Sequence, residues 1–87
     1  MYYIYILKMN NNKLYTGSTS DLKRRIIEHK KGKVTSTKNF LPVDLILYEG
    51  YILKSDAQRR EKYLKTTEGK RFLRQQIKDY LNKAGIV

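Results

Sequence analysis

The sequence has no cysteine and no tryptophan, and it contains a single histidine and a single proline among its 87 residues. The absence of cysteine excludes disulfides and thiolate metal sites, which fits a reducing compartment, and we expect a cytoplasmic protein. With one histidine, a zinc site would depend mostly on carboxylates, which zinc rarely accepts alone. The scarcity of proline, together with 40% hydrophobic residues, favours a folded chain over a disordered one.

Acidic residues are also few, because eight Asp and Glu stand against 19 Lys and Arg and leave a formal net charge of +11. This excess predicts a polyanionic partner, most commonly nucleic acid, with a membrane surface as the lesser alternative. The N-terminal apolar run, residues 2–7, is too short for a signal peptide or a membrane span. We therefore expect a protein that binds nucleic acid and no membrane, and a protein partner or a homodimer stays open.

The hydrophobic pattern predicts elements in the order β-β-α-β-α-α. Strands are predicted at residues 2–7, 13–17 and 43–52 and helices at 20–31, 55–65 and 68–82, all within a single domain of residues 1–87. Asparagines at 10–12 favour a tight turn, which makes the first two strands a hairpin. Thr19 or Ser20 is the expected N-cap of the first helix, and Gly32 is its expected end. The residues S-D-A-Q at 55–58 predict a capping box on the second helix.

The predicted first helix carries two candidate catalytic residues. His29 follows Arg25 by four residues, so both side chains share a helix face with Leu22 and Ile26, which have the character of core residues. A guanidinium suits a planar, bidentate hold on a phosphate. For Arg24 and Arg25 the alternative is a role in surface solubility. For His29 the alternative is an ordinary position at a helix C-terminus, where the helix dipole favours a cation.

Glu61 lies on the small apolar face of the predicted second helix, because Ala57, Glu61 and Leu64 are spaced at i, i+4 and i+7. A half-buried carboxylate is costly unless a cation compensates its charge. That cation is either a structural partner, such as Arg25, or a divalent metal ion. Spacing alone favours the structural ion pair, because such pairs also occupy positions of this kind.

The predicted hairpin carries Tyr5 and Tyr15 on neighbouring strands. Tyrosines in such places usually lie at the rim of the core. A tyrosine acts as a general base only if nearby positive charge lowers its pKa from about 10. Arg25 and a metal ion at Glu61 would supply that charge. Gly17 either ends its strand or lets a phosphate approach the backbone closely.

In this order, these residues resemble the GIY-YIG nuclease family across nearly the full length of the chain. The two signature tripeptides correspond to Tyr3-Ile4-Tyr5 and Tyr15-Thr16-Gly17, with Tyr3 in place of a glycine and Thr16 in place of an isoleucine. The segment TSDLKRRIIEH is similar to the family's helix, with Arg25 at the arginine position and His29 one turn later. The segment AQRREKYLK is similar to the family's metal-binding helix, with Glu61 at the glutamate position.

The resemblance implies an α+β fold in which a three-stranded antiparallel sheet is flanked by helices. It implies hydrolysis of phosphodiester bonds in DNA, in repair or processing, with one divalent ion, Mg²⁺ or Mn²⁺, bound by Glu61. Arg25 would hold the scissile phosphate, and His29 would assist a tyrosine. Tyr5 or Tyr15 would orient or deprotonate the attacking water.

On this interpretation the catalytic side chains converge on one concave surface; they are Tyr5, Tyr15, Arg25, His29 and Glu61. The residues expected to bind nucleic acid are Gly17, Lys23, Arg24, Lys30 and Lys38. Two alternatives from other classes stay open. The first is a nucleic-acid-binding module with the same fold and no turnover, and the second is a basic accessory protein bound to a larger partner.

Overall fold

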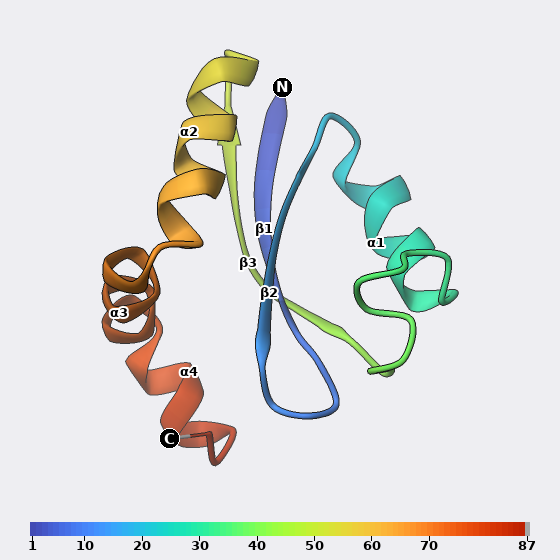
Figure 1. The fold of residues 1–87 in the computed structure, drawn as a ribbon, viewed down its shortest axis with the longest axis vertical. Coiled ribbons are helices and arrows are strands. Elements are labelled where there is room, and N and C mark those ends of the chain that lie inside the picture. The colour runs from blue at the N-terminus through green and yellow to red at the C-terminus, as the bar shows by residue number, and fades with distance from the viewer. Residues whose placement is uncertain (87) are drawn as a thin grey trace.

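The computed structural model describes residues 1–86 of the chain. Its elements are β1 (Tyr2–Lys8), β2 (Leu14–Thr19), α1 (Leu22–Lys30), β3 (Asp44–Tyr51), α2 (Lys54–Leu64), α3 (Thr67–Gln76) and α4 (Lys78–Lys83). Figure 1 shows the sheet in the middle, with α1 on one side and α2, α3 and α4 on the other. The predicted α+β fold, with a three-stranded antiparallel sheet between helices, is confirmed.

The sheet has the strand order β2-β1-β3, so β1 is the central strand and β2 lies at an edge. Residues 4–7 of β1 are all buried, because helices cover both faces of this strand. That explains why the N-terminal run is continuously apolar rather than alternating. Asn12 takes a positive φ of 64° in the turn before β2, as the asparagine-rich segment predicted.

Alternate residues of β1 build two separate cores on the two faces of the sheet. Ile4 and Ile6 pack with Leu64 and other residues of α2 and α3. Tyr5 packs with Ile26 of α1 and with the segments on either side of that helix. This alternation continues into β2, whose residues therefore face α1 and α2 in turn. Among residues 1–86, no helix is both long enough and apolar enough to cross a membrane.

The start of the first helix differs from the prediction. β2 continues through Thr19, and the N-cap is Asp21 rather than Thr19 or Ser20. The Asp21 carboxylate accepts a hydrogen bond of 3.1 Å from the backbone N–H of Arg24. A carboxylate is favoured there because it also interacts with the positive end of the helix dipole. Gly32 follows the helix with a φ of 73°, which fits the expected end.

The later helices also differ from the prediction. The capping box is wrong: α2 begins after Leu53, which makes no side-chain cap hydrogen bond, and Ser55 lies inside the helix. The predicted helix 68–82 is two helices, because Ile77 leaves helical backbone angles (φ −109°, ψ 27°). Ile77 is β-branched and has a modest helix propensity, so the break falls where the helix is intrinsically weaker.

Candidate active site at the edge of the sheet

Tyr5, His29 and Thr37 form a hydrogen-bonded chain on the α1 side of the sheet. The Tyr5 hydroxyl lies 2.8 Å from Nε2 of His29, and Nδ1 of His29 lies 2.7 Å from the Thr37 hydroxyl. His29 and Thr37 are 0% exposed, and Tyr5 is 1% exposed. Both ring nitrogens of His29 therefore have partners, and the imidazole is held between β1 and the segment that follows α1.

Burial favours the neutral forms of Tyr5 and His29, the two titratable residues in this series of hydrogen bonds. Burial first, and then the positive charge of Arg25, lower the pKa of His29. Burial raises the pKa of Tyr5, and the opposing interaction with the Arg25 guanidinium does not cancel that effect. Tyr5 therefore keeps its proton in the free protein. In the free protein, Arg25 alone therefore does not lower the pKa of Tyr5 below its usual value, and the choice between Tyr5 and Tyr15 stays a prediction.

The donors in the chain can be assigned from the chemistry of its members. The buried Tyr5 hydroxyl has Nε2 of His29 as its hydrogen-bond partner, and we assign the phenol as the donor. Because a neutral imidazole has one donor and one acceptor nitrogen, Nδ1–H donates to the Thr37 hydroxyl. The Thr37 hydroxyl, which can donate or accept, satisfies Nδ1 in this tautomer.

Tyr15 and Arg25 complete the cluster on the α1 side. The Tyr15 ring centroid lies 5.3 Å from that of His29 and 6.4 Å from that of Tyr5. Nη1 of Arg25 lies 3.3 Å from Oε1 of Glu28, and 37% of the Arg25 side chain is exposed. Contact with Tyr5 is the largest cause that raises the pKa of Arg25. Four of the five predicted catalytic residues therefore lie together, with Arg25 at the boundary with solvent.

Gly17 makes room for Tyr5. The two residues pair across β1 and β2. A Cβ atom at Gly17 would lie 2.5 Å from Cζ of Tyr5 and still closer to its hydroxyl. The ring of Tyr5 cannot retreat freely, because it packs against His29 and Tyr15. The space beside Gly17 is thus filled by Tyr5, which corrects the expectation that this glycine leaves room for a phosphate.

Glu61 lies on α2, which packs on the opposite face of the sheet from α1. Its Oε1 accepts a hydrogen bond of 2.8 Å from the Ser18 hydroxyl, and its Oε2 lies 3.0 Å from the Lys65 ammonium. The side chain of Glu61 is 21% exposed. The structural ion pair favoured by the spacing is present, but its cation is Lys65 and not Arg25, which pairs with Glu28 on its own helix.

The edge strand β2 brings the two groups of residues near one another. Gly17 and Ser18 are adjacent, so their Cα atoms lie about 3.8 Å apart while they face opposite sides of the sheet. Tyr5 covers Gly17, and Glu61 binds Ser18. Glu61 is also the last of the causes that raise the pKa of Tyr5. The five predicted residues approach one point on the edge from both faces, which corrects the expectation of a single concave face.

The donor set at Glu61 suits magnesium better than zinc. Within residues 1–86 no group of three or more His, Asp or Glu side chains is placed to hold a metal ion. Mg²⁺ commonly uses one or two carboxylates together with water and substrate phosphates. Glu61 fits that pattern as a single protein ligand, because the exposed Lys65 partner holds its oxygen only weakly.

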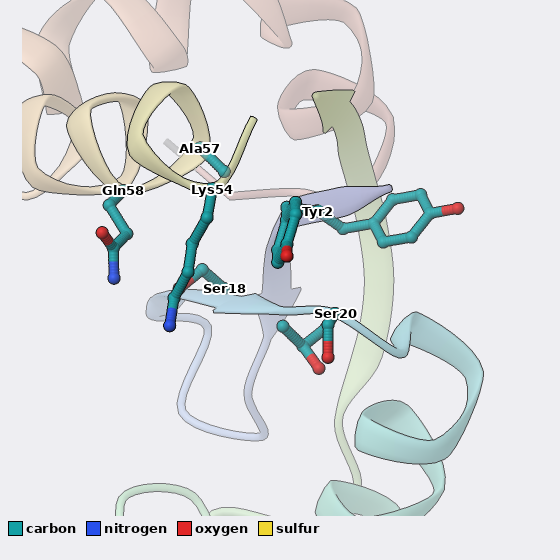
Figure 2. Close-up of a pocket in the computed structure, with 8 residues that line it drawn as sticks. Tyr2, Ser18, Ser20, Lys54, Ala57 and Gln58 are labelled. Atoms are coloured by element: carbon teal, nitrogen blue, oxygen red, sulfur yellow. The ribbon is translucent and has the colours of Figure 1, made fainter. Parts of the chain in front are cut away.

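A hollow of about 240 Å³ lies beside Ser18, between β2 and the first turns of α2. Figure 2 shows Lys54 and Gln58 projecting from α2 toward β2, with Ser18 and Ser20 on the strand side. We call it the Lys54 hollow. Gln58 precedes Glu61 by three residues, so the hollow opens beside the Glu61 carboxylate along the same helix face.

Two residues of the site, Ser18 and Thr37, were not predicted from the sequence. Ser18 follows Gly17 on an alternating strand, so the period of two already indicated that it faces the other side. That signal was available. Thr37 belongs to a segment with no helical or strand periodicity, and nothing local in the sequence distinguishes it from Thr35. Its role follows only from the packing of this segment against His29.

The four predicted basic contacts for nucleic acid are all exposed. Lys23, Arg24 and Lys30 lie on α1, and Lys38 lies in the segment after it. Arg24 also approaches Glu28, at 3.9 Å. These side chains line the solvent-facing surface on the α1 side, and their role in binding stays a prediction.

Comparison with known sequences identifies the domain. The sequence model described as the GIY-YIG catalytic domain matches residues 1–78. The chain belongs to the GIY-YIG family. This confirms the resemblance seen in the sequence. GIY-YIG domains are of the endonuclease type, so the cluster at the edge of the sheet is the candidate active site of a nuclease-type domain.

Relatives of similar size support this GIY-YIG assignment. A UPF0213 protein of Staphylococcus epidermidis is 42% identical over 66 residues, which are 75% of this chain and 80% of the relative. A UPF0213 protein of Clostridium perfringens is also 42% identical over 66 residues, covering 75% of this chain and 71% of the relative. The solution NMR structure of a UPF0213 protein from Bacillus halodurans has a TM-score of 0.54 and 34% identity, covering 84% of this chain and 82% of that chain.

Proposed function

We propose that this GIY-YIG domain is an endonuclease that hydrolyses phosphodiester bonds in DNA with one divalent cation, Mg²⁺ or Mn²⁺. The observation that carries the proposal is the position of Arg25 and Glu61 on the two sides of β2: Glu61 accepts a hydrogen bond from Ser18, and Arg25 interacts with Tyr5, which packs against Gly17. One group suits a phosphate and the other suits a hard cation. A net charge of +11 would draw a polyanion to that edge.

Glu61 would hold the cation together with oxygens of the substrate phosphate. A bound divalent cation supplies charge neutralisation at a phosphoryl oxygen. Ser18 keeps the Glu61 carboxylate oriented by its 2.8 Å hydrogen bond, so the carboxylate is positioned before any ligand arrives. Lys65 is 54% exposed, so its ammonium can turn into solvent when the Glu61 carboxylate binds the cation.

Arg25 would hold the scissile phosphate. Its guanidinium has five N–H donors, and its contacts with Glu28 and Tyr5 leave some of them for a phosphate. The interaction with the buried Tyr5 restricts the motion of the Arg25 guanidinium, so the side chain loses less conformational entropy when a phosphate binds. The Arg25 guanidinium would then already be in position to stabilise the negative charge that develops on the phosphate in the transition state.

Between the two tyrosines, we assign the attacking water to Tyr15. Tyr5 is fully buried, donates to His29 and has a raised pKa, so it holds Arg25 and His29 in place instead of taking a proton. Tyr15 is half-buried beside the same imidazole. Tyr15 would therefore be the phenol that orients or deprotonates a water at the edge of the sheet.

The test is incubation of the purified protein with labelled branched, single-stranded and duplex DNA, with Mg²⁺ or Mn²⁺ against EDTA. Cleavage that requires the cation supports the proposal, and preference for the branched substrate would fit a role in repair or processing. DNA binding without cleavage of any substrate would instead favour the non-catalytic binding module. The same assay on RNA of the same sequence shows whether the protein cleaves DNA or RNA.

A further inference from the structure

A second hollow, of about 290 Å³, lies on the α2 face of the sheet between β2 and α3. Its base is apolar and comes from Leu14, Leu64 and Leu73, with Thr16 on the strand side. Its rim is cationic and consists of Lys13, Lys70 and Arg74. We call it the Lys70 hollow. No acidic side chain lines it.

The rim charges are uncompensated within the protein. Lys70 and Arg74 are one helical turn apart on α3, a spacing at which like charges repel. Lys13 comes from the hairpin and meets them across the hollow. Within residues 1–86, no carboxylate forms an ion pair with any of the three. Three cations around one depression raise the energy of the free protein, and an anion in the hollow would relieve that cost.

The Lys70 hollow and Glu61 lie along the same strand. Leu14, Thr16 and Ser18 face the α2 side of β2, as their pairing with β1 requires. Strand residues rise about 3.4 Å each, so Ser18 lies about 14 Å from Leu14. Successive phosphates of one strand lie farther apart along the backbone than the rise of about 3.4 Å along the duplex axis, so this distance corresponds to fewer than about four nucleotides.

We infer that the Lys70 hollow is a subsite for a backbone phosphate of the bound nucleic acid, a few nucleotides from the phosphate at Glu61. The inference rests on the proposed function, since it takes Glu61 as the position of the scissile phosphate. The sugar-phosphate backbone then follows the edge strand from the Lys54 hollow, past Glu61, to the Lys70 hollow. The apolar base receives the sugar, while the rim holds the phosphate oxygens.

The test compares two double charge reversals. Lys70→Glu with Arg74→Glu removes the rim, and Lys78→Glu with Lys83→Glu is the matched control on exposed lysines of α4. Each pair lowers the formal net charge from +11 to +7, since two positive side chains become negative. Binding to a labelled duplex of about 20 base pairs is measured by fluorescence anisotropy in EDTA over a salt series.

The rim variant should lose at least about tenfold more affinity than the control, and its salt dependence should fall by about two counterions. Equal losses in the rim and control variants would overturn the subsite and leave only general charge attraction. If the reversal variant fails to fold, Lys70→Gln with Arg74→Gln against Lys78→Gln with Lys83→Gln decides the point.

This experiment separates the subsite from the nuclease proposal. Binding is read without a cation, so a protein that never cleaves DNA still reports whether the rim contacts phosphate. Cleavage by the wild type in Mg²⁺, with no difference between rim and control variants in binding, would instead retain the nuclease and reject the subsite. Thermal unfolding of both variants checks that neither change alters the fold.

Discussion

The two sides of the sheet differ in how much they are closed. On the α1 side, Tyr5, His29 and Thr37 are buried, neutral and joined by hydrogen bonds of 2.7–2.8 Å. On the α2 side, Glu61 is partly exposed, binds one hydroxyl and one exposed ammonium, and lies between two hollows. The closed side fixes positions, and the open side is where ligands can enter. Substitutions on the α1 side should therefore mainly reduce stability, whereas substitutions on the α2 side should mainly reduce cleavage.

The largest effect is expected on the open side. Glu61→Gln keeps the shape of the side chain and removes the charge that would hold a divalent cation. Cleavage should fall by about a hundredfold or more, since losing one such stabilising group commonly has that effect. DNA binding should be retained or improve slightly, because a negative charge leaves a surface that faces phosphates. Cleavage rate, anisotropy and melting temperature are measured together.

The control for this change is Glu68→Gln, which removes the same charge from an exposed position on α3. It should leave cleavage near the wild-type rate. If Glu61→Gln lowers the melting temperature and leaves cleavage unchanged, Glu61 is a structural anion and the proposed metal role is wrong.

A change in the backbone between the two sides should affect both stability and activity. Gly17→Ala places a methyl group against the Tyr5 ring, which cannot move without disturbing His29. Overpacking of this kind commonly costs about 1–3 kcal/mol of unfolding free energy. Denaturant unfolding measures the loss, and cleavage should fall with it because Tyr5 supports Arg25.

Gly50→Ala is the matched control, because it is the same substitution in the other edge strand. The group that a Cβ would meet there is the flexible thioether of Met1, which can move aside. A loss of stability as large in Gly50→Ala as in Gly17→Ala would mean that the Tyr5 contact has no special role.

On the closed side alone, Thr37→Val should reduce stability through one lost hydrogen bond. Valine has a similar shape but cannot accept from Nδ1–H of His29, which stays buried. An unsatisfied buried donor costs about 1–3 kcal/mol. Thr35→Val, an exposed neighbour in the same segment, should change stability little. Equal unfolding free energies for the two variants would show that the Thr37 hydroxyl does not hold the imidazole.

The sequence was sufficient to predict the three strands, the first two helices and several facts about their faces, but not the break at Ile77 that divides the last predicted helix. Short apolar runs located the strands, and helical spacing put Arg25 beside His29 and Glu61 beside Leu64. The family signature, read from the same residues, supplied the α+β arrangement. Each of these signals is local, because it depends on residues within a few positions of one another.

The arrangement across the edge strand could not be predicted in this way. Helical spacing tells which residues share a face of α1 or α2, but it does not tell which face of the sheet each helix covers. The expectation that Glu61 and Arg25 line one surface therefore had no local support, and it was wrong in that respect. The contact of Thr37 with His29 is equally non-local, since it depends on how an irregular segment packs.

The smallest effect is expected from pH, and it should come from the closed side. Burial lowers the pKa of His29 below its unfolded-state value of about 6.5. Above about pH 6.5 the imidazole is neutral in both states, so it adds no pH dependence there. As the pH falls below about 6.5, His29 binds a proton in the unfolded chain but stays neutral in the folded protein. Stability should therefore decrease with falling pH until the folded-state pKa is reached.

The comparison that isolates this effect is His29→Gln, whose amide can still meet the Tyr5 hydroxyl but cannot be protonated. Melting temperatures of wild type and variant are measured at about pH 7.5 and about pH 5, where most carboxylates still keep their charge. The wild type should lose more stability between the two values than the variant does, even if the variant is less stable throughout. A parallel decrease in both proteins would mean that the imidazole takes up protons equally well when folded, and the closed side would then be open to water.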